Sequence, residues 1–178
     1  MQTHIALLRG INVGGKVLKM ADLKAAVSTL GFTEVTTYLQ SGNLVFRSSE
    51  DDGAALAARI AMAIRDHQSM DVGVMVRTAR QWGHVISANP YPQAETLPKT
   101  VHAFILDRMP EPGRIAMLEA KEAGSEEWRI ADGTLYLHTP DGFGKSVLGN
   151  IVERTLKVSM TARNWNTVRA LQGLADAL

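Results

Sequence analysis

Apolar residues recur along the first half of the chain in two spacings, one typical of strands and one typical of helices. Short apolar or β-branched runs predict strands at residues 4–9, 34–39, 44–47 and 72–77. Apolar residues three or four apart predict a helix over residues 20–30 and a second that begins near Asp51 or Asp52 and includes Ile64. The predicted order of elements is therefore β-α-β-β-α-β.

The second half repeats this order of patterns. Strand patterns lie at residues 101–107, 127–131, 134–139 and about 158–162. Helical patterns follow Pro112, start again near Lys145, and end the chain with a stripe from Val168 to Leu178. Asp132-Gly133 is a strong hairpin signal between two of these strands. The two halves share this order of elements but little direct residue identity.

A βαββαβ order is the ferredoxin-like pattern, in which helices cover one face of an antiparallel sheet. The sequence therefore predicts an α+β fold with two such halves, joined by a connecting helix and followed by a C-terminal helix. We expect the halves at residues 1–78 and 101–178, with the connection at 79–100. Thr78 can cap the connecting helix, which should end before Asn89-Pro90.

The composition excludes several classes of function. The chain has 178 residues, of which 46% are hydrophobic and 21% charged, and its net charge of +1 gives no bulk attraction to nucleic acid or membrane. The absence of cysteine excludes disulfides, thiol catalysis and cysteine–zinc sites, and it fits a reducing compartment. Residues 1–9 do not resemble a secretory signal, and no stretch is long enough to span a membrane. We therefore expect a cytoplasmic protein.

Positive charge is concentrated at the two ends of the chain. Residues 1–47 and residues 145–178 each hold five basic and two acidic side chains, whereas the middle of the chain is acidic. The five histidines show no metal-ligand spacing, so no metal site is predicted, and the sequence leaves the identity of any cofactor unknown. The acidic pair Glu126-Glu127 is expected to be exposed.

The first candidate site is the run Gly10-Ile11-Asn12-Val13-Gly14-Gly15-Lys16, which matches the first seven positions of a phosphate-binding loop. The eighth position should be Ser or Thr but is Val17, and the helical stripe starts only near Met20. These departures favour a glycine-rich nest that binds an anion with help from Lys16 and Arg9 over a nucleotide-hydrolysing loop. The alternative is a tight turn that needs glycine, which leaves Asn12 and Arg9 unexplained.

Two further segments combine turn chemistry with polar side chains. Gln40-Ser41-Gly42-Asn43 has the composition of a hairpin turn, although Gln40 and Tyr38 share one sheet face and could accompany a ligand. Gly142-Phe143-Gly144-Lys145-Ser146 precedes a predicted helix. Ser146 and the glycine amides there could cap that helix or hold an anion at its N-terminus.

The last candidate segment is Arg163-Asn164-Trp165-Asn166-Thr167. Asn166 or Thr167 can cap the final helix, and Trp165 can pack against it. Arg163 and Asn164 then remain as polar groups beside an aromatic ring, between a strand and a helix. A cation, an amide and a planar surface together are typical of a small-ligand site.

These motifs carry a resemblance to a known family. The run from Ala6 to Lys16, the run from Thr37 to Asn43, Asn89-Pro90 and the run from Thr161 to Val168 are similar to motifs of domain-of-unknown-function family 1697. The resemblance spans nearly the whole chain. It implies a bacterial-type cytoplasmic protein with a duplicated ferredoxin-like fold, and it implies no activity.

Three functions remain open from the residues. The first is binding of a small anionic ligand, such as a nucleotide or phosphorylated metabolite, in a cleft between the two halves. The second is dimerisation of a structural or interaction protein through an open sheet face. The third is nucleic-acid binding, for which only Tyr38, Phe46 and Tyr136 could stack bases. The predicted ligand-binding residues are Arg9, Asn12, Gly14, Gly15, Lys16, Ser41 and Asn43 from the first half, with Lys145, Ser146, Arg163, Asn164, Trp165 and Asn166 from the second.

Overall fold

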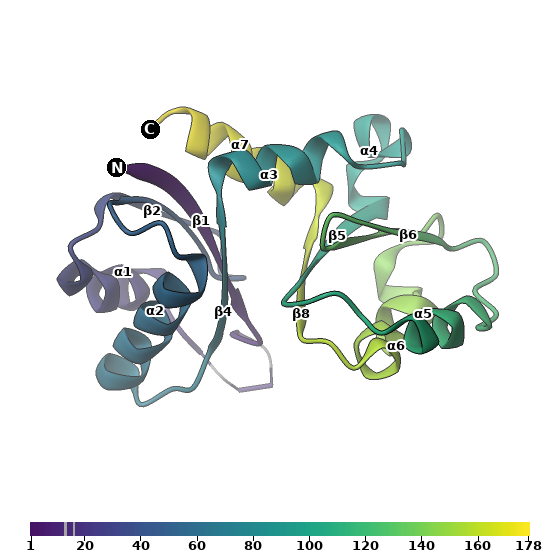
Figure 1. Ribbon diagram of the computed structural model, residues 1–178, viewed down its shortest axis with the longest axis horizontal. Helices are drawn as coiled ribbons and strands as arrows, with labels where there is room; N and C mark the ends of the chain where they lie inside the picture. Colours follow the sequence, from purple (N-terminus) through teal and green to yellow (C-terminus); the bar gives the residue numbers. More distant parts are fainter. Residues whose placement is uncertain (13, 16) are drawn as a thin grey trace. The chain divides into compact units, whose positions relative to one another are not determined.

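The computed structural model describes residues 1–12, 14–15 and 17–178. By its internal contacts the chain divides into two units, which Figure 1 shows in sequence colours. Unit 1 comprises Met1–Gly83 together with Ala170–Leu178, and unit 2 comprises His84–Arg169. The last nine residues, which the sequence pattern assigns to the second half, therefore group with unit 1.

Unit 1 has the predicted βαββαβ order. Its elements are β1 (Gln2–Arg9), α1 (Met20–Val27), β2 (Thr33–Tyr38), β3 (Asn43–Ser48), α2 (Gly53–Gln68) and β4 (Gly73–Thr78). Among the described residues these strands form one four-stranded sheet in the order β2-β3-β1-β4, and every neighbouring pair is antiparallel. Helices α1 and α2 lie together on one face of this sheet (Figure 1). The Asp52 side chain accepts hydrogen bonds from the first amides of α2. Of the two predicted caps, Asp51 and Asp52, it is therefore Asp52 that caps this helix.

Unit 2 repeats the same architecture. Its elements are β5 (Val101–Leu106), α5 (Pro112–Glu119), β6 (Glu127–Ala131), β7 (Thr134–His138), α6 (Val147–Leu156) and β8 (Met160–Asn164). The described strands form a second four-stranded antiparallel sheet in the order β6-β7-β5-β8. The strand predicted near 158–162 is β8, which lies about two residues later because its ladder with β5 begins at Met160, opposite Leu106.

In the part of the chain that the structure describes, three α-helices lie outside the two βαββαβ patterns, namely α3 (Ala79–Ser87), α4 (Gln93–Thr96) and α7 (Trp165–Asp176). Thr78 caps α3 as predicted, because its hydroxyl accepts the Gln81 amide at 3.1 Å. The Gln81 side chain in turn accepts the Thr78 amide at 2.9 Å, which completes a capping box. The predicted α+β class, with two ferredoxin-like sheets, a connecting helix and a C-terminal helix, is confirmed.

Each unit has a hydrophobic core between its sheet and its two covering helices. In unit 1, Leu8 and Phe46 from the sheet pack with Leu23 of α1 and Ile60 of α2. In unit 2, the core contains Phe104, Leu118, Leu137, Leu148 and Val152. Burial of these side chains is the main stabilising contribution to each unit, at about 1.5–3 kcal/mol for each fully buried large aliphatic or aromatic side chain.

The strand registers also reveal residue equivalences between the units that the sequence pattern did not predict. His4 lies opposite Thr78 in unit 1, and His102 lies opposite Asn164 in unit 2. Each histidine stacks on a phenylalanine, with ring centroids 5.6 Å apart for His4 and Phe46 and 4.0 Å apart for His102 and Phe143.

An arginine precedes the residue opposite each histidine, and the two arginines have the same local contact. Arg77 Nη1 donates to the carbonyl oxygen of Val76 at 2.9 Å, and Arg163 Nη1 donates to that of Ala162 at 2.8 Å. The repeat therefore extends from the order of elements to single positions on matching strands.

Candidate functional site

The glycine loop after β1 is held in shape by the side chain of Asn12. Its amide nitrogen donates to the carbonyl oxygen of Leu18 at 3.1 Å and to that of Gln40. Its amide oxygen accepts the backbone N–H of Leu18 at 3.0 Å. One asparagine thus closes the loop on itself and joins it to the turn between β2 and β3. Asn12 also has a φ of 55°, a conformation that asparagine tolerates better than most residues.

The turn between β2 and β3 packs directly against this loop. The Leu8 amide donates to the carbonyl oxygen of Gly42 at 2.8 Å. Gly42 has a φ of 76°, and a Cβ atom there would lie 2.8 Å from Leu8 Cβ and closer still to Ile11 Cδ1. Only glycine fits such a contact. Two of the segments that carry the family resemblance, distant in sequence, therefore meet at one end of the unit 1 sheet.

Asn43 has a structural part in the same turn. It is fully buried, and its amide nitrogen donates to the carbonyl oxygen of Tyr38 at 2.6 Å and to Ser41 Oγ at 3.1 Å. These contacts are the local side-chain-to-backbone bonds by which asparagine stabilises turns. Ser41 itself is exposed.

Parts of the loop are exposed. Arg9, Gly14 and Gly15 are exposed. Gly14 and Gly15 have φ values of 59° and 89°, and no atom lies within 4 Å of where their Cβ atoms would be. The N–H groups of Ile11, Asn12, Gly14 and Gly15 donate to no other residue that the structure describes. Lys16, predicted as part of this site, lies outside the described residues.

In unit 2, the N-terminus of α6 already holds a carboxylate of the same chain. Ser146 caps the helix by accepting the Gly149 amide at 2.7 Å. The Glu126 carboxylate accepts the Ser146 hydroxyl at 2.9 Å and the amides of Val147 and Leu148 at 2.8 and 3.0 Å. Glu126, expected to be exposed, is half-buried here and occupies the position that an anionic ligand would need. Lys145 beside it is exposed.

Arg163 and Asn164 belong to β8 and have local structural contacts. Arg163 is 7% exposed, and it donates to Thr161 Oγ1 at 2.9 Å as well as to the Ala162 carbonyl. Burial lowers the pKa of Arg163 to about 10. Asn164 Oδ1 accepts the Thr167 amide at 3.1 Å, so Asn164 caps α7 in place of the predicted Asn166 or Thr167.

The other two members of this motif begin α7. Trp165 is buried, with its ring centroid 6.5 Å from that of Tyr136. Asn166 is exposed. Of the polar residues predicted as ligands in unit 2, Lys145 and Asn166 are the exposed ones among the residues described, whereas Ser146, Arg163 and Asn164 bind neighbouring parts of the protein.

The aromatic residues that could stack nucleic-acid bases are mostly inaccessible. Phe46 and Tyr136 are both fully buried, and the Tyr136 hydroxyl donates to the Val85 carbonyl at 2.8 Å. Burial raises the pKa of Tyr136 to about 12. Tyr38 is half-buried. A stacking platform needs exposed rings on the central strands, and these three residues do not supply one.

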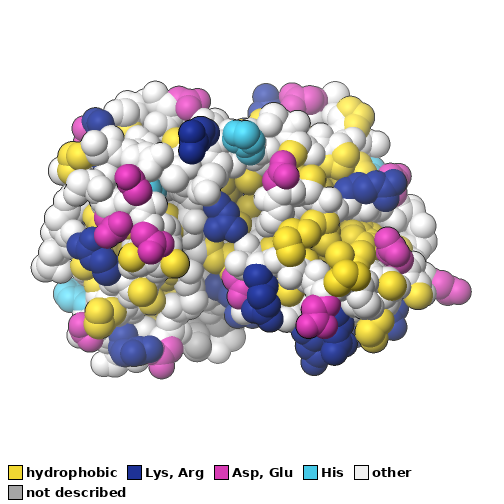
Figure 2. Space-filling model, in the orientation of Figure 1, with side chains coloured by type: hydrophobic (Ala, Val, Ile, Leu, Met, Phe, Trp, Pro, Cys, Tyr) yellow, Lys and Arg dark blue, Asp and Glu magenta, His cyan; other side chains and the backbone are white. Residues whose placement is uncertain are grey.

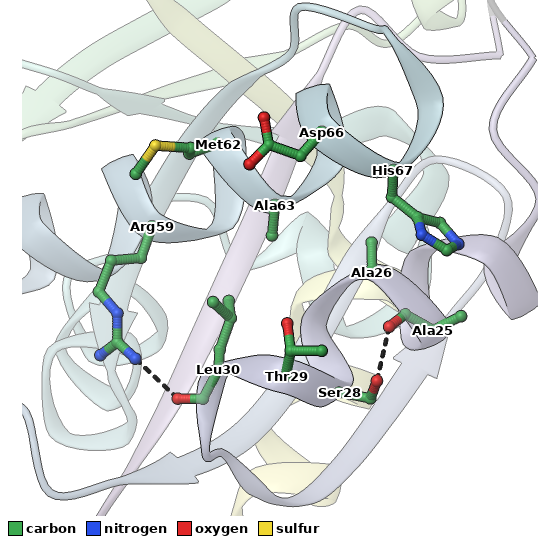
Figure 3. A pocket seen from close by; sticks show the side chains of 10 residues that line it. All are labelled: Ala25, Ala26, Ser28, Thr29, Leu30, Arg59, Met62, Ala63, Asp66 and His67. Atoms are coloured by element: carbon green, nitrogen blue, oxygen red, sulfur yellow. Dashed lines mark hydrogen bonds between the residues drawn. The ribbon is translucent and has the colours of Figure 1, made fainter.

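A groove of about 600 Å³ lies between α1 and α2 on the outer side of unit 1 (Figure 3). Three alanines, Leu30 and Met62 form its apolar lining, and Asp66 and His67 lie on α2. Its one arginine, Arg59, donates to the Leu30 carbonyl at 2.7 Å and lies over the Phe32 ring at 5.5 Å. Arg59 of α2 thus contacts the segment between α1 and β2.

A second hollow, of about 560 Å³, lies in unit 2 at the C-terminus of α6. Arg108, Arg154 and Lys157 line it together with Glu153. Arg108 donates to the Lys157 carbonyl at 2.9 Å and pairs with Asp107 at 3.2 Å. Cations are stabilising at a helix C-terminus, which is a structural reason for this cluster. No sequence motif predicted this cluster as a site, although the basic charge of the C-terminal segment was the available signal.

Two classes of site are absent from the described residues. In residues 1–12, 14–15 and 17–178, no group of three His, Asp or Glu side chains is placed to hold a metal ion. Over the same residues, no helix combines the length and the apolar composition that crossing a bilayer requires.

The family whose members are described as proteins of unknown function (DUF1697) has a model that matches residues 1–136. The chain belongs to this family. The match includes both the glycine loop and the β2–β3 turn, and it stops before the Thr161–Val168 motif. The resemblance proposed from the sequence is thereby confirmed, and the family description assigns no activity.

One solved structure supports the fold. The structure of a conserved bacterial protein, SP0830, from Streptococcus pneumoniae matches with a TM-score of 0.75 and 20% identity, over 98% of each chain. At this identity the likeness shows a shared fold alone. Protein BT0572 from Bacteroides thetaiotaomicron is 10% identical over 90% of this chain and 92% of that chain, but a TM-score of 0.23 carries no argument. No curated protein matches the chain.

Proposed function

We propose that this chain binds a small anionic ligand, such as a nucleotide or a phosphorylated metabolite, at the glycine loop of unit 1. The observation that carries the proposal is the set of backbone N–H groups at Ile11, Asn12, Gly14 and Gly15, which donate to no other described residue. Successive N–H groups in left-handed and turn conformations form concave anion-binding surfaces. Gly14 and Gly15 also lack side chains that would obstruct a ligand.

The hydrogen bonds of the Asn12 side chain support this proposal. These three hydrogen bonds do not use the backbone N–H groups of Ile11, Asn12, Gly14 or Gly15. Because these bonds fix Asn12 against Leu18 and Gln40 before a ligand arrives, less conformational entropy is lost on binding, so a weakly charged site can still bind with useful affinity. The adjacent exposed Arg9 adds a permanent cation that can form charge-assisted hydrogen bonds.

The proposal is for binding and not for nucleotide hydrolysis. Val17 stands where a phosphate-binding loop needs a hydroxyl for Mg²⁺, and α1 begins only at Met20. In a phosphate-binding loop the helix begins at the lysine, so that its first amides face the phosphate. Here the helix begins too late along the chain for that arrangement. The loop amides and Arg9 would recognise a phosphate group, while the rest of the ligand would determine specificity.

Calorimetric titration with inorganic phosphate, pyrophosphate, AMP and ADP tests the proposal. We expect saturable binding of at least one of these, and we expect Arg9→Ala to weaken it about tenfold, the effect of losing one charged hydrogen bond. Arg154→Ala, in the basic hollow of unit 2, is the matched control and should leave the affinity unchanged. Binding that is lost in Arg154→Ala and kept in Arg9→Ala would place the site in unit 2 and overturn the proposal, as would no binding of any probe.

A further inference from the structure

Strand β6 is a regular edge strand with an unprotected outer side. Within the described residues it pairs only with β7, in an unbroken register from Glu127 opposite His138 to Ala131 opposite Thr134. The corresponding edge of unit 1 differs. In β2 the register shifts between Thr33 and Thr36, and Glu34 between them has a φ of 54°. Such a bulge protects an edge strand from pairing with another chain, and β6 has none.

The hairpin geometry identifies which groups β6 presents outward. Asp132 and Gly133 both have positive φ, 46° and 74°, as a two-residue hairpin turn requires. The flanking pair in such a hairpin is hydrogen-bonded, and bonded and non-bonded pairs then alternate. Trp128 and Ile130 therefore direct their N–H and C=O groups away from β7. Consistent with this, Arg129 Nη1 reaches the Trp128 carbonyl oxygen at 3.2 Å.

A groove of about 510 Å³ with a mixed lining lies beside this edge, between β6 and α5. Its lining combines the apolar side chains of Met109, Ile115, Trp128 and Ile130 with the charged side chains of Glu119 and Arg129. Met109 is 56% exposed, and Met117 on α5 is 49% exposed. Figure 2 shows hydrophobic side chains gathered over this part of unit 2. A strand added to β6 would cover both the outward backbone groups of Trp128 and Ile130 and the open end of this groove.

We infer that the added strand is β6 of a second copy of this chain, paired antiparallel about a two-fold axis at Trp128. Three registers place outward-facing residues of two β6 strands opposite each other, with axes at residues 128, 129 and 130. The axis at Trp128 sets Glu127 opposite Arg129 of the second copy, and the reverse, so it forms two cross-strand ion pairs. The axis at Arg129 sets two arginines opposite each other. The axis at Ile130 sets neither Glu127 nor Arg129 opposite a side chain of the other charge.

The pairing has consequences for each partner. In the dimer, Arg129 leaves the Trp128 carbonyl of its own chain and pairs with the Glu127 carboxylate of the second copy. The Trp128 carbonyl then accepts a hydrogen bond from the Trp128 amide of the second copy. Glu127 and Arg129 are exposed, so the exchange disturbs no core. One short strand pair buries less surface than the roughly 1,600 Å² of a standard stable interface. The dimer is therefore weak, and it weakens further as salt screens its ion pairs.

Sedimentation equilibrium at low salt, over a wide range of protein concentration, tests the charge pairing. We expect a reversible dimer, with Glu127→Arg and Arg129→Glu each raising its dissociation constant about tenfold or more, because each reversal puts two like-charged pairs across the axis. The double variant Glu127→Arg/Arg129→Glu restores the pairing and should return to within about threefold of the original. Lys121→Glu, a charge reversal outside the strand, should have no effect. A strict monomer, or a double variant as weak as the single ones, overturns the inference.

Disulfide trapping tests the register directly, because the chain has no cysteine of its own. Glu127→Cys and Arg129→Cys place thiols at positions that face each other across the proposed axis, within the roughly 4.4–6.8 Å between Cα atoms that a disulfide spans. Mild oxidation of the two variants mixed should yield the mixed dimer in preference to either homodimer. Preferential trapping of Arg129→Cys with itself would establish the register with its axis at Arg129 and overturn the inference. Equal trapping of all pairs would show random collision and would also overturn it.

Discussion

At the scale of single residues, the polar side chains of the candidate motifs mostly hold the fold. Asn12 joins the glycine loop to the β2–β3 turn, Asn43 stabilises that turn, and Asn164 caps α7. The sequence could identify these amides as unusual because each lies in a turn or at a strand end. It could not tell a ligand contact from a backbone contact, because the accepting carbonyl of Gln40 is 28 residues from Asn12.

Replacing Asn12 tests whether its side chain stabilises the fold. We expect Asn12→Ala to lower the free energy of unfolding by about 2–3 kcal/mol, because it removes three hydrogen bonds and leaves a residue less tolerant of positive φ. Asn12→Gly loses the same bonds but accepts the backbone conformation, so it should be about 1 kcal/mol less destabilising. Urea unfolding of both variants measures these values. Changes below about 0.5 kcal/mol in both would contradict the structural role of Asn12.

A second residue-scale prediction concerns His102. Burial against Phe143 lowers the pKa of His102 from 6.5 to about 4, so the unfolded chain takes up a proton at a higher pH than the folded one. The stabilisation from the neutral histidine is thus fully present above pH 6.5 and is lost as pH falls toward 4. We expect His102→Leu to remove about 3 kcal/mol of this pH dependence in urea unfolding between pH 7 and 4.

The comparison with wild type is needed because burial also lowers the pKa of His4, which occupies the equivalent position in unit 1. Its contribution to acid sensitivity has the same sign as that of His102 and should persist in the variant. If His102→Leu and the wild-type chain lose stability in parallel across this pH range, His102 is not a buried neutral histidine.

At the scale of elements, the start of α6 shows why an anion-site prediction from sequence needed a correction. Glycine, lysine and serine before a helical stripe indicate either a cap or an anion site, and the local residues cannot separate the two. The deciding group is Glu126, which lies 20 residues before Ser146. By contrast, the Asp132-Gly133 turn and the Thr78 cap depend on neighbours within three residues, and both were predicted.

A double-mutant cycle between Ser146 and Glu126 tests this assignment. Glu126→Gln keeps the size of the side chain but removes the charge that faces the helix N-terminus, so we expect a loss of about 1–2 kcal/mol of unfolding free energy. Ser146→Ala should cost about 1 kcal/mol. Because the two groups share a hydrogen bond, the double variant should lose about 0.5–1 kcal/mol less than the sum of the single losses. Full additivity would show that the contact contributes nothing.

At the scale of the whole molecule, hydrophobic periodicity was enough to predict two ferredoxin-like sheets, because helix and strand spacings are set by local geometry. The residue equivalences between the units could not be predicted from the sequence, because His4 is matched with His102 only through the strand registers. The hairpin turns also differ in length between the units, which shifts any simple comparison of their sequences. The predicted site residues, likewise, are divided between the two units.

The central claim is that the glycine loop of unit 1 is an anion site, and backbone amide NMR tests it most directly. In a ¹⁵N-labelled chain titrated with phosphate and then with ADP, we predict saturable shifts of the Gly14 and Gly15 amides, and weaker saturation in Arg9→Ala. Saturable shifts confined to the amides around Arg154 and Lys157, or no saturable shift anywhere, would contradict the claim.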